Sequence, residues 1–184
     1  MEKHSDQEIL AFIRNPVNME YGFRCLLANY QERLYWHIRR MAIDHEDAND
    51  ILQNVLLKVY RSIANFRGDA QLFTWLYRIA TNETLTFLNK KQKKSTVALE
   101  SELTNLEEKL KADPYFDGSA VQLELQKALA QLPEKQRLVF NMRYFEELSY
   151  KEISEILETS VGALKASYHH AAKKIEAYVK ANVG

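Results

Sequence analysis

The chain has 184 residues, 25 basic and 25 acidic side chains, and therefore no formal net charge. A chain of this length holds one domain or two small ones. It has only five Gly and three Pro, and the three Pro together with Gly68 and Gly118 fall where helical patterns break, which favours an all-α fold. The single Cys25 stands among apolar residues, which indicates a reduced core thiol rather than a metal ligand. No apolar run reaches membrane-spanning length and no secretion signal opens the chain, so we expect a soluble cytoplasmic protein without direct membrane insertion.

The first part of the chain predicts four helices. Ser5 and Glu8 have the spacing of a capping box, which predicts the start of a short helix. A longer helix is expected from Asn18, a third over residues 45–65, and a fourth from Leu72 into a lysine cluster. Together these helices predict an N-terminal four-helix domain.

The third helix carries a polar face. Asp47, Asp50 and Asn54 lie three and four residues apart, so they share one exposed side near the helix N-terminus, where carboxylates are favourable. Gln53 stands beside them. This stripe suits contact with a basic protein partner.

The segment that follows, residues 66–94, combines the groups that are needed to bind single-stranded DNA. Flat rings accept a base, amides read its edge and cations hold phosphates. Apart from its rings, the segment supplies Arg67, Arg78, Asn82 and the lysines Lys90, Lys91, Lys93 and Lys94. The alternative is that Phe73, Trp75 and Tyr77 mainly fill the core, and for Trp75 the core interpretation is favoured.

Charge alternates along the chain. Residues 61–94 carry a net charge of +5, residues 95–118 a net charge of −4, and the segment from Lys165 onward a net charge of +3. Two basic blocks around an acidic one suggest two nucleic-acid surfaces joined by a segment that avoids DNA. Each block by itself also fits an ordinary solvated surface.

The charge pattern and the helical pattern predict the same division. We expect an N-terminal domain at residues 1–94, a flexible acidic linker at 95–118 and a C-terminal domain at 119–184. The linker carries Leu99, Leu103, Leu106 and Leu110 at helical spacing, so part of it is a candidate helix that orders on docking.

The C-terminal domain predicts two helices before a helical pair. The first is lined by apolar residues at helical spacing and broken by Pro133, and the second carries two more. These residues are Val121, Leu125, Leu129 and Leu132 in the first helix, and Leu138 and Met142 in the second.

Residues 148–175 predict two short helices around a tight turn. Ser149 and Glu152 form a capping box, and Ser160 is placed to cap the second helix after a turn at Glu158–Ser160. In that helix one face is expected to be buried, formed by Val161, Leu164, Tyr168, Ala171 and Ile175. The opposite face is small, polar and basic. This is the pattern of a helix-turn-helix DNA reader, although any packed helical pair shows the same periodicity.

Three stretches carry a resemblance to a known family. They are DANDILQNVLLKVY, NFRGDAQLFTWLYRIATNETLTFLNKK and LPEKQRLVFNMRYFEELSYKEISEILETSVGALKASYHHAAKKI. In order and spacing they resemble the extracytoplasmic-function (ECF) class of the sigma-70 factors of bacterial RNA polymerase. The resemblance implies an N-terminal domain that docks on the β′ clamp and opens the −10 promoter element. It also implies a C-terminal domain that contacts the β flap and reads the −35 element as duplex.

The same resemblance assigns roles to the linker and to further partners. The linker would occupy the RNA path of the polymerase. An anti-sigma factor is an expected partner, with the Leu99–Leu110 stripe as a candidate contact. Besides polymerase and promoter DNA, no small-molecule substrate is expected.

Site residues in the N-terminal domain follow by position. Asp47, Asp50, Gln53 and Asn54 match the clamp-binding helix, although the family usually has Glu at the position of Asn54. The loop that captures a flipped −10 base is matched by Phe66, Arg67, Gly68 and Asp69. Asn82 matches a residue that helps to specify that base, and the lysine cluster would contact nearby phosphates.

Site residues in the C-terminal domain lie on the second helix of the pair. The residues expected to contact the −35 element are Lys165, Ala166, Ser167, His169, His170, Lys173 and Lys174. Family members often carry Arg where this chain has Ser167, His170 and Ala172. Since Arg forms the common bidentate guanine contact, we hypothesise a weaker or less G-rich −35 readout.

Two other functional classes explain less of the sequence. A conventional helix-turn-helix regulator would explain residues 148–175 but leave the motifs of residues 47–82 without a purpose. An enzyme is not expected, because the sequence has no phosphate-binding Gly-rich loop, no catalytic constellation and no metal-ligand spacing that we recognise. Adjacent histidines diverge by about 100° on a helix, so DNA contact is favoured over metal binding for His169 and His170. No cofactor is expected.

Overall fold

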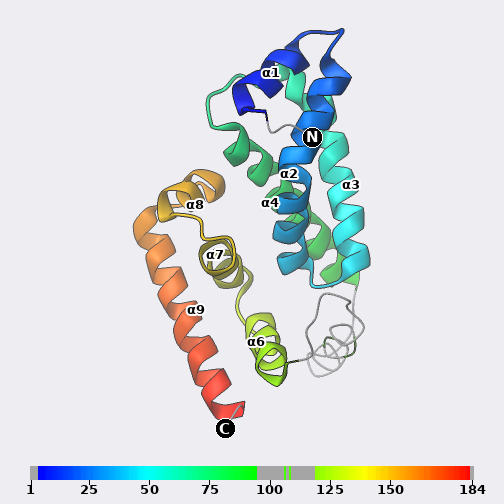
Figure 1. Ribbon diagram of the computed structural model, residues 1–184. Helices are drawn as coiled ribbons and strands as arrows, with labels where there is room; N and C mark the ends of the chain where they lie inside the picture. Colours follow the sequence, from blue (N-terminus) through cyan, green and yellow to red (C-terminus); the bar gives the residue numbers. More distant parts are fainter. Residues whose placement is uncertain (1–3, 95–105, 107, 109–118, 183–184) are drawn as a thin grey trace. The chain divides into compact units, whose positions relative to one another are not determined.

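The computed structural model describes residues 4–94, 106, 108 and 119–182. The regular structure of these residues is helical, as predicted (Figure 1). The elements are α1 (Asp6–Arg14), α2 (Met19–Ala42), α3 (His45–Ser62), the 3-10 turn η1 (Ile63–Asn65), α4 (Leu72–Lys94), α6 (Ala120–Ala130), α7 (Glu134–Tyr144), α8 (Tyr150–Leu157) and α9 (Val161–Asn182). No helix of the described residues is long and apolar enough to cross a membrane.

The chain divides into two compact units. One comprises residues 1–42 and 46–87, and the other comprises residues 43–45 and 88–184. The domain boundaries predicted from the sequence remain predictions. The predicted linker helix lies outside the described residues, except for Leu106, which is helical and buried, and Glu108, which is helical and exposed.

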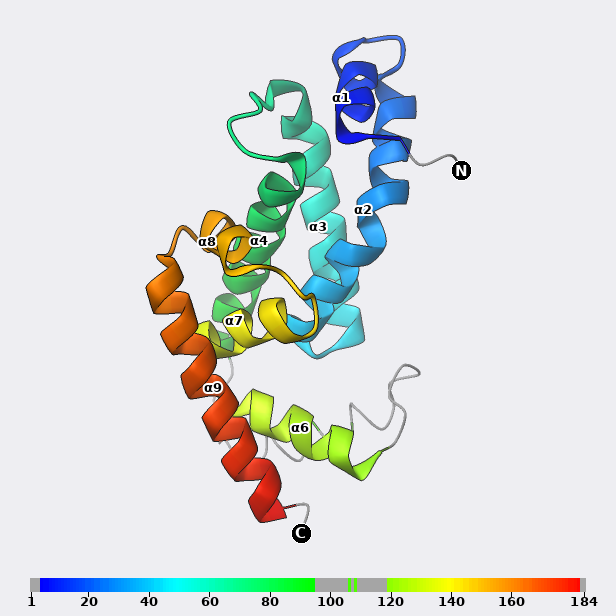
Figure 2. The same ribbon diagram turned by 60° about the vertical axis from the view of Figure 1, so that its left-hand side comes forward.

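The N-terminal unit begins with the predicted capping box of α1. The Ser5 N–H donates to Glu8 Oε2 at 2.8 Å, and the Glu8 N–H donates to Ser5 Oγ at 3.3 Å. The hydrogen bonds that the Glu8 carboxylate accepts, from the Ser5 N–H and then from the Ser5 hydroxyl, hold the pKa of Glu8 below its usual value. α1 packs against the start of α2 (Figure 2). Gly22 lies at the crossing, where an added Cβ would be 2.8 Å from Ile13 Cγ1.

The core of this unit is formed by the inward faces of α2, α3 and α4. Their apolar residues are almost completely buried, among them Leu34, Ile38, Ile51, Val55, Val59 and Leu76. Within the same interior, His37 Nε2 lies 2.9 Å from Thr81 Oγ1, which joins α2 to α4. On the outside, Lys58 Nζ lies 2.5 Å from Glu83 Oε1 and joins α3 to α4. The packing therefore fixes which faces of α3 and α4 remain open to partners.

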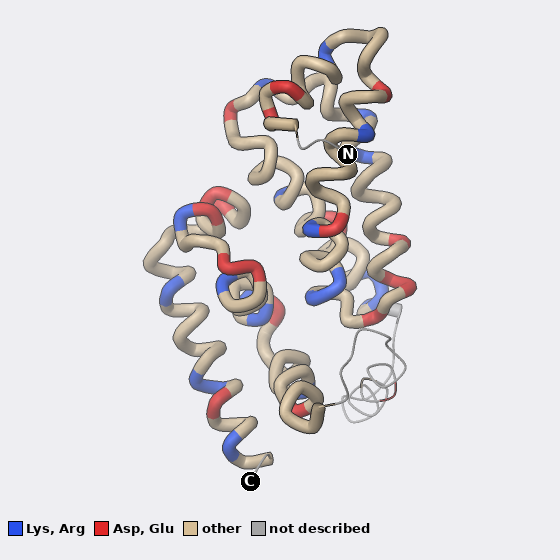
Figure 3. The backbone as a smooth tube through the Cα atoms, in the orientation of Figure 1, with Lys and Arg blue, Asp and Glu red and all other residues tan. Residues whose placement is uncertain are grey.

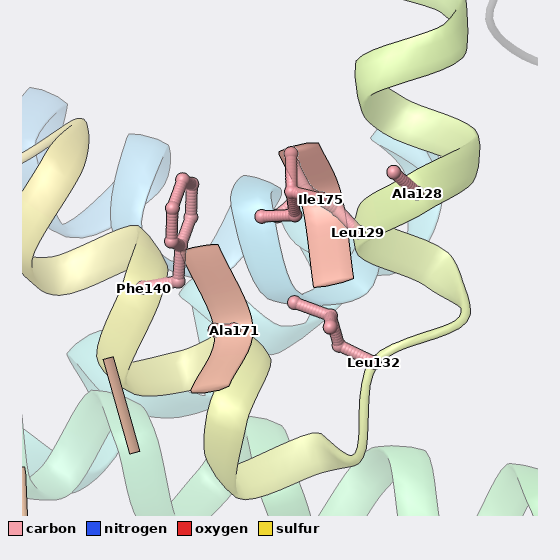
Figure 4. Packing of buried hydrophobic residues seen from close by; sticks show 6 residues of the cluster. All are labelled: Ala128, Leu129, Leu132, Phe140, Ala171 and Ile175. Carbon is pink, nitrogen blue, oxygen red and sulfur yellow. The ribbon is translucent and has the colours of Figure 1, made fainter. Parts of the chain in front are cut away.

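In the C-terminal unit, α6, α7 and α9 share a small apolar core (Figure 4). Its buried residues are Ala128, Leu129, Leu132, Phe140, Ala171 and Ile175. Two predicted core residues do not join it. Val121 is 54% exposed and Val161 is 37% exposed, so these two predictions were wrong. Both lie in the first turn of their helices, where the helical period continues but the packed cluster has not yet begun.

Candidate protein and nucleic-acid interfaces

The first candidate interface is the outer face of α3. Asp50, Gln53 and Asn54 are exposed, and Asp47 is half-buried. Steps of three and four residues bring Asp47, Asp50 and Asn54 to one side of the helix. Acidic segments gather at the first turns of α3 (Figure 3). This face offers negative charge and amide groups to a partner.

Two apolar side chains extend this face, and the sequence analysis did not single them out. Leu57 is 54% exposed and Tyr60 is 42% exposed. Asp50, Asn54 and Leu57 follow one another by four and three residues, so they form one stripe. The Tyr60 ring packs edge-on against Phe23 of α2, with 5.0 Å between the ring centroids. The helical spacing of Leu57 from Asp50 and Asn54 could have predicted that Leu57 belongs to this face, but the spacing does not show that its side chain is exposed.

The second candidate interface begins at the loop before α4. Gly68 has a φ of +82°, a left-handed conformation that Gly adopts without steric cost. Arg67, Gly68 and Asp69 are exposed, whereas Phe66 is buried and packs against Trp75 with 5.2 Å between centroids. Phe66 therefore anchors the loop, and its three following residues form the accessible tip.

The aromatic residues of α4 divide between the core and the surface. Phe73 and Tyr77 are buried and pack together, with 4.2 Å between ring centroids. The Arg33 guanidinium lies 4.8 Å from the centre of the Phe73 ring. Trp75 is half-buried, so it belongs only partly to the core favoured for it from the sequence. Its partial exposure leaves the flat ring beside Phe66 within reach of solvent.

A polar stripe continues from this loop along α4. Arg78 is half-buried and Asn82, one turn later, is exposed. Lys90, Lys91 and Lys93 are exposed in the last turns of the helix, and Lys94 ends it. One side of the helix carries Arg78, Asn82 and Lys93, because Asn82 lies four residues after Arg78 and Lys93 lies about three turns after Asn82. The stripe therefore offers an amide near the loop and positive charge farther along.

The third candidate interface is the pair α8 and α9. The Ser149 N–H donates to Glu152 Oε2 at 2.7 Å, and the Glu152 N–H donates to Ser149 Oγ at 3.2 Å, which completes the predicted capping box. The Ala163 N–H donates to Ser160 Oγ at 3.3 Å, so Ser160 caps α9 as predicted. Glu158 makes the turn between the helices with a φ of +52°. These local contacts define a helix-turn-helix.

The outer face of α9 holds the residues expected at a DNA major groove. Lys165, Ala166, His169, His170, Lys173 and Lys174 are exposed, and Ser167 is half-buried. Basic segments recur along α9 (Figure 3). The inner face buries Leu164, Ala171 and Ile175, with Tyr168 half-buried. The structure thus brings the predicted site residues to one accessible side.

The exposed histidines diverge from each other. The ring centroids of His169 and His170 are 6.1 Å apart and the rings are tilted by 58°. Across the part of the chain that the structure describes, no group of three or more His, Cys, Asp or Glu side chains could hold a metal ion.

Comparisons with known proteins identify the family of this chain. Residues 26–94 match the model of sigma-70 region 2, and residues 122–175 match the model of sigma-70 region 4. The ECF RNA polymerase sigma factor SigW of Bacillus subtilis is 34% identical over 158 residues, which cover 80% of this chain and 83% of SigW. The chain belongs to the ECF RNA polymerase sigma factors.

Other members of the family are similar over most of the chain. The ECF sigma-E factor of Escherichia coli K12 is 30% identical over 84% of this chain and 85% of its own length. The RNA polymerase sigma-H factor of Pseudomonas aeruginosa is 27% identical over 96% of this chain and 94% of its own length. As a sigma factor, the protein binds core RNA polymerase and recognises promoter DNA to initiate transcription.

Solved structures of low sequence identity share the fold of this sigma factor. The sigma factor RpoE of Bartonella quintana, in complex with the anti-sigma factor NepR, has a TM-score of 0.67 at 22% identity and covers 86% of this chain and 96% of its own. CnrH, in complex with the cytosolic domain of CnrY, has a TM-score of 0.69 at 20% identity and covers 96% of this chain and 98% of its own.

Proposed function

We propose that the outer face of α3 is the surface with which this sigma factor binds the β′ clamp. Asp47, Asp50, Gln53 and Asn54 supply the polar contacts, and Leu57 with Tyr60 supplies an apolar end to the same stripe. The observation that carries this assignment is the exposed run Asp50, Asn54 and Leu57 inside the segment that matches region 2. Charged contacts orient a partner, while buried aromatic and aliphatic side chains contribute most binding free energy.

The loop before α4 and the stripe along α4 are assigned to the −10 element. Phe66 packs on Trp75 and so holds the loop in shape. The extruded base is therefore received by the exposed residues of the loop, which are Arg67, Gly68 and Asp69. Asn82 and Arg78 follow on the adjoining helix. Lys90, Lys91, Lys93 and Lys94 attract the phosphates of the melted strand.

The outer face of α9 is assigned to the −35 element. Lys165, Ala166, Ser167, His169 and His170 face the major groove, and Lys173 and Lys174 lie farther along the same outer face. A small, Arg-poor face forms few bidentate guanine contacts, so recognition relies on tethering through polymerase. A binding-site selection dominated by guanine at −35 would contradict this assignment.

The remaining assignments concern location and partners. The protein acts in the cytoplasm, is not itself an enzyme, and contacts the β flap through its C-terminal domain. An anti-sigma factor that covers the polymerase-binding surface is a further partner, in keeping with the complex of RpoE with the anti-sigma factor NepR. We retain residues 1–94, 95–118 and 119–184 as the two domains and their linker.

The decisive experiment is run-off transcription with purified core RNA polymerase and a library of promoter fragments. Asp50→Arg reverses charge at the centre of the α3 face and is expected to abolish clamp binding and initiation. Asn54→Glu adds the carboxylate usual in the family and is expected to strengthen binding to core polymerase. Binding is measured by fluorescence anisotropy of labelled protein.

A matched control reverses charge elsewhere on the same unit. Glu20 is exposed in the first turn of α2, outside the segment that matches region 2, so Glu20→Arg should leave initiation intact. Equal activity of Asp50→Arg and wild type, with both folded by circular dichroism, would refute the clamp assignment. Promoter-specific binding that needs no polymerase would favour the conventional regulator instead.

A further inference from the structure

The junction of α7, α8 and α9 gathers two cations around one aromatic ring. Tyr150 is the first residue of α8 and is half-buried. The Arg143 guanidinium of α7 lies 5.2 Å from the centre of its ring, and the Lys165 ammonium of α9 lies 5.9 Å from the same point. Both distances lie within the range of cation–π attraction. Tyr168 of α9 packs edge-on against this ring, with 6.3 Å between centroids, and so helps to fix its position.

The two cations differ in how firmly they are held. Arg143 also donates from Nη1 to the Leu148 carbonyl at 3.0 Å, which ties it to the loop before α8. Lys165 is exposed, and among the described residues its contact is the Tyr150 ring. The ring is therefore what holds the lysine near Arg143.

The position of Lys165 limits what it can reach. Its ammonium group lies against the ring of Tyr150, at the start of α8. A lysine ammonium is a compact point charge without the planar fork of an arginine, and one held against a ring is less available to a base edge. Two like charges gathered on one patch are stabilised by an anion, and the nearest anion on bound duplex DNA is a backbone phosphate.

We propose that Tyr150 is a positioning residue that holds Lys165 beside Arg143 as a phosphate-binding pair, so that Lys165 contacts the DNA backbone and does not read a base. This inference rests on the proposed −35 role of α9. It implies that Lys165 contributes affinity for duplex DNA without sequence preference. The −35 specificity then falls on the remaining exposed residues of the helix.

The test uses the full chain assembled with core RNA polymerase on duplex fragments selected from a random library. Lys165→Ala is expected to weaken binding about threefold to tenfold on every fragment. The slope of log affinity against log salt concentration should become smaller by about 1, which corresponds to the loss of one phosphate contact. The base preference of the selected −35 element is expected to stay the same. Flattening of the preference at one base position by Lys165→Ala would overturn the proposal.

Variants of Tyr150 test the positioning role. Tyr150→Phe keeps the ring and should bind like wild type, whereas Tyr150→Leu removes the cation–π contact and should weaken binding on all fragments. In a Lys165→Ala background, Tyr150→Leu should add little, because the ring acts through the lysine. Additive effects of the two changes, or equal loss from Tyr150→Phe and Tyr150→Leu, would contradict the role of the ring.

The outcome separates this inference from the proposed function. If wild-type holoenzyme selects no −35 element, and His169→Ala changes nothing, the assignment of α9 to −35 has failed. If wild type selects an element that His169→Ala alters while Lys165→Ala changes neither affinity nor salt dependence, only the phosphate-binding inference has failed. Circular dichroism of each variant excludes unfolding as the cause of a loss.

Discussion

Gly22 is the position where adding one methyl group tests the packing of α1 most directly. A Cβ built there would lie 2.8 Å from Ile13 Cγ1, 2.8 Å from Phe12 Cβ and 2.9 Å from the Ile13 backbone nitrogen. Ile13 Cγ1 can rotate away, but Phe12 Cβ and the Ile13 backbone nitrogen move only if α1 shifts. Gly22→Ala is therefore expected to displace α1 from α2.

The size of the effect follows from two opposing contributions. Overpacking of this kind costs about 1–3 kcal/mol, and a backbone clash belongs to the upper part of that range. Ala is better than Gly within a helix by about 1 kcal/mol, which offsets part of the cost. The N-terminal unit should lose about 1–2 kcal/mol of stability.

The positions of the two tryptophans make the assay specific for this unit. The chain has two Trp residues, Trp36 on α2 and Trp75 on α4, and both lie in the N-terminal unit. Urea unfolding followed by tryptophan fluorescence therefore reports this unit alone. With a urea m value of about 2 kcal/mol per molar, the midpoint should fall by roughly 0.5–1 M. Hydrogen exchange across residues 5–15 should become faster.

Gly162→Ala provides the matched control. Gly162 is exposed in the first turn of α9, and no atom lies within 4 Å of the place a Cβ would occupy. The same substitution should stabilise the C-terminal unit by up to about 1 kcal/mol and leave the tryptophan transition unchanged. If Gly22→Ala leaves the tryptophan midpoint unchanged or raises it, the argument from close packing is refuted.

Two further predictions concern a backbone conformation and a buried hydroxyl. Glu158 has a φ of +52°, which disfavours residues with a Cβ, so Glu158→Gly should stabilise the C-terminal unit by about 1 kcal/mol. Thermal unfolding followed by circular dichroism measures the change. As a control, Glu155→Gly lies within α8 and should destabilise the same unit. Burial, and then a hydrogen bond from Tyr30 Oη to Asp6 Oδ1 at 2.6 Å, raises the pKa of Tyr30 far above its ordinary 10.0. The neutral phenol therefore stabilises the fold fully below pH 10.0, and this contribution declines at higher pH. Wild type should therefore be more stable than Tyr30→Phe in urea unfolding, and this difference in stability should become smaller above that pH. A difference that stays constant with pH would contradict the stabilising role of the neutral phenol.

The sequence was sufficient for features that depend on neighbours along the chain. The capping boxes at Ser5 and Ser149 and the cap at Ser160 were predicted and are present, because a capping side chain reaches backbone only three residues away. The all-helical fold and the faces of α3 and α9 followed from the helical period. The family followed from motif order, and the comparisons confirm it.

The exposure of a side chain and its contacts with other helices could be learned only from the tertiary structure. Val121 and Val161 have core spacing but are exposed, because the period along a helix does not reveal where its neighbour ends. Phe66 has the chemistry of a base-stacking ring, yet it packs against Trp75. Likewise, the contact between Lys165 and Tyr150 joins two helices across a turn. Periodicity assigns a residue to a side of its own helix, whereas exposure and partners depend on the other helices that pack there.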